Sequence, residues 1–143
     1  MRNIKISGFI TVLFIVLILF PTVVLAKSFD NPNAALDAKY NGTNLTINKS
    51  NVSINQTVRV KLTLKIDGKK ARGVIANLKV EKTTAVAGTT VLNTSTVTSS
   101  SGKAIWKFKL RDIDVSAVSG DTYLLTVDLQ DGTVIGSTTI VVR

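Results

Sequence analysis

Few side chains in this sequence could carry out acid–base, nucleophilic or metal chemistry. The 143 residues include no His and no Cys, which removes a Ser-His-Asp triad, a cysteine nucleophile, a His/Cys zinc site and any disulfide. Paired carboxylates are the remaining candidates for chemistry. The nine acids are Asp30, Asp37, Asp67, Glu81, Asp112, Asp114, Asp121, Asp128 and Asp131.

Three of these acids lie close together in the sequence. Asp112 and Asp114 are two residues apart, and Asp121 follows them. Carboxylates of this kind can bind Ca²⁺, but a loop that keeps them in water is the simpler interpretation. Glu81 is expected to pair with a lysine on a neighbouring strand. Because no acid, base or nucleophile pair can be assigned, we expect a protein that is not an enzyme and holds no metal or cofactor.

Basic residues outnumber acidic residues by 18 to 9, for a net charge of +9. The alternation of the sequence points six of the cations to the outside of predicted strands. If those strands are neighbours, the six form a basic face for acidic polysaccharide or lipid head groups; a solvated surface is the alternative. Nucleic acid is not expected, because few aromatic residues accompany the charges. The six are Arg59, Lys61, Lys65, Lys103, Lys107 and Lys109.

The first 26 residues have the layout of a signal peptide for Sec export. A basic segment, residues 1–5, precedes the apolar run 6–20, and Pro21 then breaks any helix. Val24 and Ala26 place slender or small residues at −3 and −1 of a cut before Lys27. We therefore expect a secreted or cell-surface protein that meets the membrane only through this segment.

Two other fates of this segment stay open. Ser7-Gly8 before an apolar run that starts at Phe9 resembles the leader of archaeal type IV pilins, which retain the apolar helix for assembly. In that case the helix 9–26 would build a filament. An uncleaved anchor is the other alternative, although the run is marginal in length for a membrane span.

The remainder of the chain predicts β-strands, because apolar and polar residues alternate with period two. Trp106 and Phe108 share the apolar side of one strand and are expected in the core. Turns are expected at Asp67-Gly68, at 99–102 and at Asp131-Gly132. The fold class is an all-β, antiparallel sandwich of about seven to eight strands. The expected strands cover 57–66, 74–81, 89–97, 103–110, 122–129 and 133–142, with short strands near 45–47 and 52–54.

Several segments resemble the bacterial and archaeal Ig-like domains of the invasin type, over roughly 44–143. They are Leu45-Thr46-Ile47, the run 53–58, Gly73-Val74, the turn and strand 100–106, and the strand 120–127. Tyr123 stands where a tyrosine corner would place it. Ser100 departs from the Asp that the family often has there. The resemblance implies a structural or adhesive module on a cell surface.

An additional strand is predicted before this domain, which divides the chain into a signal peptide (1–26), an extended segment (27–43) and the sandwich (44–143). Ala34, Leu36, Ala38 and Tyr40 alternate with polar or small residues. Such a strand could complete the sheet of a neighbouring copy, as in donor-strand filaments. Alternatively, it is the first strand of its own domain.

Six sequons for N-glycosylation follow the signal peptide, five of them within 17 residues, and none has Pro in the middle. A sandwich without Cys and with many sequons favours an archaeal surface. Together these features predict a glycosylated structural or adhesive module whose partners are other surface proteins or copies of itself. The alternatives are a filament subunit and a small accessory domain for polyanions or carbohydrate. The acceptor residues are Asn41, Asn44, Asn48, Asn51, Asn55 and Asn93.

Overall fold

A computed structural model describes residues 27–28, 38–84 and 88–143. The predicted signal peptide lies outside these residues, as does most of the predicted strand 34–40. Within the part described, no helix is long and apolar enough to cross a membrane.

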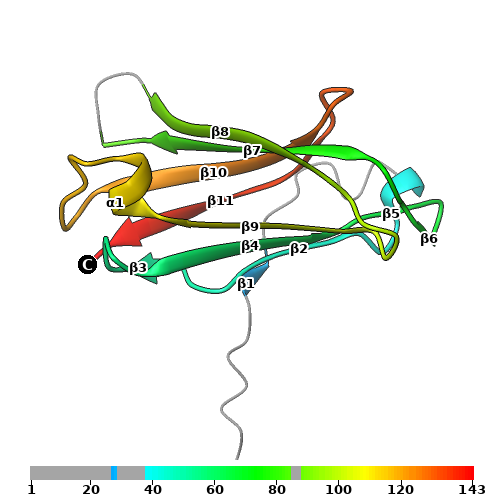
Figure 1. Cartoon of the computed structure of the whole chain (residues 1–143), viewed down its shortest axis with the longest axis horizontal. Helices are drawn as coiled ribbons and strands as arrows, with labels where there is room; N and C mark the ends of the chain where they lie inside the picture. The colour runs from blue at the N-terminus through cyan, green and yellow to red at the C-terminus, as the bar shows by residue number, and fades with distance from the viewer. Residues whose placement is uncertain (1–26, 29–37, 85–87) are drawn as a thin grey trace, which may run out of the picture.

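Two main sheets face one another in a sandwich-like arrangement (Figure 1). The first sheet is wholly antiparallel, in the order β1-β2-β4-β9. Its strands are β1 (Lys27–Ser28), β2 (Asn44–Ile47), β4 (Thr57–Thr63) and β9 (Lys103–Lys109).

The second sheet has the order β3-β11-β10-β7-β8. It is antiparallel except where β3 runs parallel to β11, which the sequence did not predict. Its strands are β3 (Asn51–Val52), β11 (Val134–Val142), β10 (Thr122–Leu129), β7 (Ile75–Lys82) and β8 (Thr89–Val97). The all-β class predicted from the alternation is therefore confirmed.

The core lies between the two sheets and is built from alternate residues of their central strands. Val58, Val60 and Leu62 of β4 are fully buried, and Leu78 and Val80 of β7 meet them from the other sheet. Trp106 is only 5% exposed, so its predicted place in the core is confirmed. Since side chains of a strand alternate between its faces, the polar residues of β4 and β9 must point outward.

The long strand predicted over 57–66 is interrupted at Leu64. The Leu64 N–H donates to Gly102 O at 2.7 Å, and its carbonyl accepts from the Ala71 N–H at 3.1 Å. The first bond lies at the end of the pairing with β9, the second joins Leu64 to the segment after β6, and β4 ends at Thr63. The following residues form a separate ribbon of β5 (Lys65–Ile66) and β6 (Lys69–Lys70), joined by the predicted turn at Asp67-Gly68.

The segment before β2 ends in a helical turn rather than a strand. Ala38–Tyr40 form a short 3-10 helix, η1, and Tyr40 is buried against the core. An extended conformation through residue 40 is therefore wrong for 38–40, because the Tyr40 ring is placed by core packing. Residues 34–37 lie outside the described part, so the donor-strand role stays a prediction.

Gly102 is expected to be sensitive to any side chain. Its φ is +71°, and a Cβ there would lie 2.6 Å from Leu64 O, a backbone atom that cannot move without breaking its bond with the Ala71 N–H. We expect Gly102→Ala to lower the free energy of unfolding by about 2 kcal/mol or more, measured by urea denaturation.

Gly132→Ala is the matched control for this prediction. Gly132 has a similar φ of +84°, but nothing lies within 4 Å of the Cβ position. Its substitution should therefore carry only the cost of the left-handed backbone, about 1 kcal/mol. Equal losses in the two variants would show that the contact with Leu64 does not matter.

Candidate functional site

The structure brings five of the six predicted cations together on the outer face of the first sheet. Antiparallel pairing of β4 with β9 sets Arg59 directly opposite Lys107 and Thr63 opposite Lys103. Lys61 and Lys109 occupy the adjoining outward positions. We call this surface, formed by Arg59, Lys61, Lys103, Lys107 and Lys109, the basic face.

The basic face has no acid to balance it. The strands β2, β4 and β9 contain neither Asp nor Glu. Within the described residues, the salt bridges of Lys79, Lys82 and Arg111 all lie away from this face. Like charges directly opposite one another on neighbouring strands are destabilising. The pair of Arg59 and Lys107 is therefore kept at a cost that an anionic ligand would relieve.

Lys65 is not part of the basic face. The break at Leu64 moves it into the ribbon, where it lies opposite Lys70. Ile105, which is 40% exposed and lies opposite Lys61, is the apolar outward residue between Lys103 and Lys107 of β9. Alternation along the chain does not show where the pairing of β4 with β9 ends, so it could not place Lys65.

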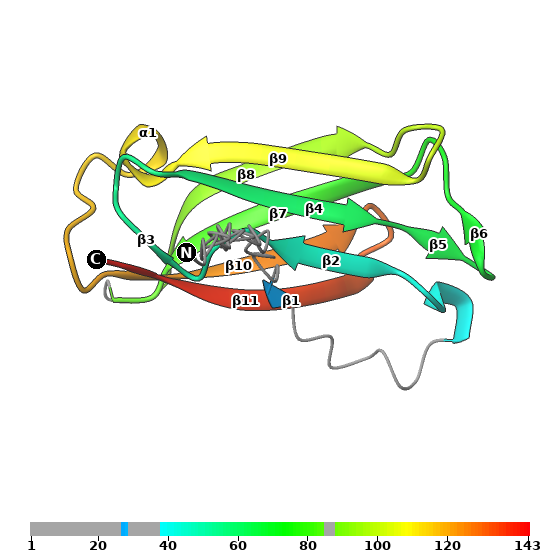
Figure 2. The ribbon, with the colours of Figure 1, turned by 90° about the horizontal axis from the view of Figure 1, so that it is seen from below.

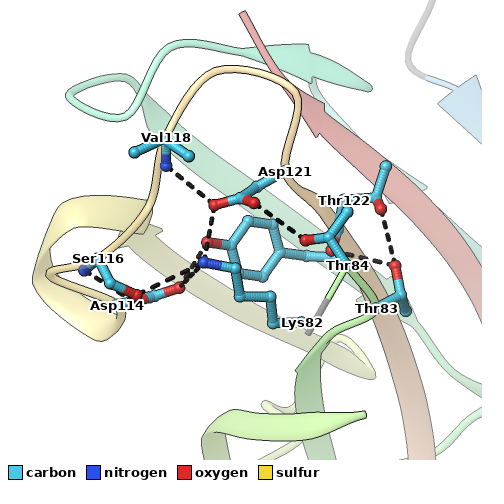
Figure 3. A network of polar contacts seen from close by, with 9 residues as sticks. Lys82, Thr83, Thr84, Asp114, Ser116, Val118, Asp121 and Thr122 are labelled. Atoms are coloured by element: carbon cyan, nitrogen blue, oxygen red, sulfur yellow. Dashed lines mark hydrogen bonds and ion pairs between the residues drawn. The ribbon is translucent and has the colours of Figure 1, made fainter. Parts of the chain in front are cut away.

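A second polar site, which the sequence did not predict, lies at one end of the sandwich beside β7 (Figure 3). Lys82, at the end of β7, places its Nζ 2.7 Å from Asp121 Oδ2 and 3.1 Å from Asp114 Oδ2. The side chains are only 13%, 10% and 9% exposed respectively. We had expected these two acids in water; instead the structure buries both around one lysine.

Further hydrogen bonds complete this cluster. The Tyr123 hydroxyl donates to Asp114 Oδ2 at 2.7 Å, and Ser116 donates to Asp114 Oδ1 from its N–H and its hydroxyl. Asp121 accepts from the Val118 N–H at 2.9 Å and from the Thr84 hydroxyl at 3.0 Å (Figure 3). Every carboxylate oxygen in the cluster thus has a donor.

These contacts fix the charges of the cluster. The bond from Lys82 and then the Val118 N–H lower the pKa of Asp121. Burial opposes ionisation of Asp114, but bonds from Ser116, Tyr123 and Lys82 outweigh it and hold its pKa well below the ordinary range. The bond to Asp121 raises the pKa of Lys82 despite its burial. Burial, followed by the bond to Asp114, raises the pKa of Tyr123 far above its usual range.

A cluster with these charges stabilises the fold and is poorly suited to catalysis. A general acid or base works best with a pKa near the working pH, and every shift here moves away from neutrality. What the cluster does is join the two ends of the loop 114–121 to the end of β7. Asp121 directly precedes β10 and Tyr123 is the second residue of that strand, so these two members of the cluster lie close together in the sequence.

The remaining acids agree only in part with expectation. Asp112 is exposed, as expected, and its side chain lies 3.9 Å from Arg111. Glu81 does pair with a lysine, but with Lys79 of its own strand at 2.8 Å and not across strands. Across the described residues, no group of three or more acids could hold a metal ion.

The structure distinguishes among the six sequons. Asn41, Asn44, Asn51, Asn55 and Asn93 are exposed. Asn48 instead uses its amide to extend the pairing of β2 with β4: Oδ1 accepts from the Arg59 N–H at 2.8 Å, and Nδ2 donates to Thr57 O at 3.2 Å. A glycan on the Asn48 nitrogen would replace one of its two hydrogens and place a sugar beside this second bond.

No family model matches this chain, and no curated protein is similar enough in sequence to count as a relative. The function must therefore be argued from the geometry of these two sites.

The buried cluster predicts how stability depends on pH. The lowered pKa values of Asp114 and Asp121 contribute stability above about pH 4, which is lost as the pH falls through their folded values. The raised pKa values of Lys82 and Tyr123 contribute stability below about pH 10, which is lost as the pH rises further. Urea denaturation across this range should give a plateau with a fall at each end.

Lys82→Met and Lys79→Met separate the cluster from an ordinary surface pair on the same strand. Without Lys82, two buried carboxylates lose their counter-ion, and we expect a loss of about 2–4 kcal/mol near neutral pH. Lys79 is 41% exposed, so its loss should cost at most about 0.5 kcal/mol. If the free energy of unfolding of Lys82→Met equalled that of the unmodified protein near neutral pH, the stabilising role of the cluster would be contradicted.

Proposed function

We propose that this protein is an exported, non-enzymatic Ig-like module of the cell surface, structural or adhesive in role, whose basic face binds acidic polysaccharide. The observation that carries the proposal is the direct opposition of Arg59 and Lys107 on a face without any acid. Charges that weaken the fold are a reason to look for a ligand there.

The strand layout supports the Ig-like part of this proposal. Taken as strands A, B and E, β2, β4 and β9 form one sheet, while β7, β10 and β11 take the places of C, F and G in the other. Tyr123 lies near the start of β10, where Ig domains have the tyrosine corner. Its hydroxyl binds a side chain, Asp114, nine residues upstream, whereas the usual corner binds backbone.

The chemistry of the basic face favours a polysaccharide. It offers one aliphatic side chain, Ile105, and no aromatic ring on which nucleic-acid bases would stack. Alternate residues on a strand repeat at about 7 Å and neighbouring strands at about 5 Å, so the cations are spaced along two adjacent strands at these distances. Repeated carboxylate or sulfate groups on an extended sugar chain match such a spacing.

Export and glycosylation complete the proposal. The layout of residues 1–26 supports Sec export, and five exposed sequons support a glycan-bearing surface. Oligosaccharides near the N-terminal end of the domain would shield the adjoining strand edges from proteases and from other chains.

Binding and stability should change in opposite directions when the opposed pair is neutralised. In Arg59→Gln/Lys107→Gln, we expect roughly tenfold weaker binding to a sulfated or carboxylated polysaccharide, from the loss of two ion contacts. Stability should rise by about 0.5 kcal/mol, because the like-charge repulsion is gone. Titration calorimetry and thermal denaturation measure the two effects.

Lys69→Gln/Lys70→Gln removes the same charge from the exposed ribbon and serves as the control. It should keep nearly all of the binding. Binding to the unmodified protein should also weaken steeply with salt. Equal losses in both double variants, or binding only to anionic lipid vesicles, would refute a polysaccharide site on this face.

N-terminal sequencing and intact mass of the native protein test export and glycosylation. We expect a chain that starts at Lys27 and carries glycan on some of the exposed sequons, with Asn48 unmodified because its amide holds β4. A start at Phe9 would instead support the pilin alternative, and an intact Met1 would support an anchored domain.

A further inference from the structure

The two sheets have four edges, and three of them are protected against pairing with another chain. β1 and β3 are two-residue strands, too short to offer a template. β9 carries Lys103, Lys107 and Lys109 along its length. Very short edge strands and edge lysines are common devices against edge-to-edge association.

The fourth edge, β8, lacks both devices. It is nine residues long, Thr89–Val97, and contains no charged residue. A bulge interrupts its pairing with β7 near Val91, but from Leu92 to Val97 the ladder is regular. Val97 is 57% exposed although it is a large apolar residue. The free side of this strand therefore offers a regular backbone ladder with no charge to repel a partner.

No described segment covers β8. Figure 2 shows it beside β9 along one flank of the sandwich. Between the two strands runs an open groove of about 490 Å³, lined by Leu92, Trp106, Phe108 and Ile113 among others. The open groove and the unprotected edge of β8 therefore lie on the same flank of the sandwich.

We propose that β8 pairs antiparallel with β8 of a second copy of this chain, forming a two-fold dimer with one continuous sheet. The partner is argued from charge. Without residues 1–26, which hold Arg2 and Lys5, the chain keeps 16 basic and 9 acidic residues, a net charge of +7. Copies therefore repel one another wherever lysines face each other, and β8 is the long edge where none do. Pairing of an edge with itself is closed, so it yields a dimer and no fibre.

In such a dimer, the two basic faces would point in the same direction. Antiparallel neighbours in a sheet are related by a two-fold axis perpendicular to the sheet, which leaves each face on its own side. Both copies of the first sheet then lie on the same side, and both basic faces point the same way. If the proposed polysaccharide function holds, the dimer binds one chain at two sites and gains affinity through avidity. The dimer itself does not depend on that function.

Asn93 lies near the middle of β8 on its outer side, opposite Lys79 of β7. An oligosaccharide on Asn93 would stand beside the two-fold axis and collide with its copy. The dimer is therefore expected to carry Asn93 unmodified, and full occupancy of this sequon in the native protein would overturn the proposal.

The test is sedimentation velocity over a range of protein concentrations, on full-length protein processed by the cells that express it. An edge contact is small, so we expect a reversible monomer–dimer equilibrium. Raising the salt concentration should strengthen it, because salt screens the repulsion between two cationic copies. Salt should weaken polysaccharide binding, so the two proposals predict opposite effects of salt. Either of them can therefore be refuted without the other.

Asn93→Lys/Val97→Lys introduces like charges on β8 of both copies and should raise the dimer dissociation constant at least tenfold. Asn41→Lys/Val115→Lys makes the same exchange at exposed positions away from the edge and should leave it unchanged. Hydrogen exchange should show protection of the amides of 92–97 that grows with protein concentration. A monomer at all concentrations, an edge variant that still dimerises, or growth beyond a dimer would each overturn the proposal.

Discussion

Burial of one side of β4 and β9 against β7 and β10 is the constraint on which the other features of this protein depend. Once Val60 and Trp106 enter the core, strand geometry turns Arg59, Lys61 and Lys107 outward on one continuous surface. No acid stands among the outward residues of these strands. The closure of the core orients the cations, and the residue types at the outward positions make the face positive.

At the end of the sandwich, by contrast, charged groups are buried and every carboxylate oxygen has a donor. Lys82 lies between two carboxylates that would otherwise repel each other, Tyr123 and Ser116 donate to Asp114, and Thr84 and Val118 donate to Asp121. Buried ion pairs add little net stability over apolar packing, but removing one partner is costly. This cluster gives the loop 114–121 one defined position, whereas the basic face leaves its charges free to meet a ligand.

The edges of the sheets show a similar division between protected and available surfaces. Two-residue strands and lysines close three edges, while β8 stays long and uncharged. In a chain with a net positive charge, repulsion keeps most surfaces of two copies apart. In the dimer that we propose, self-association uses the one long edge that carries no charge.

Alternation in the sequence determined the all-β class, the main strands, the place of Trp106 in the core and the outward direction of the cations on β4 and β9, because each depends only on local period and parity. The tertiary structure decided the rest. Pairing of β4 with β9 ends at Thr63, and Lys65 lies opposite Lys70 in the ribbon instead of on the basic face. Lys82 meets Asp114 and Asp121 only after strands distant in sequence come together, and Tyr40 leaves the predicted strand to pack on the core. Contacts between residues far apart in the chain leave no periodic trace in the sequence, which is why local patterns could not reveal them.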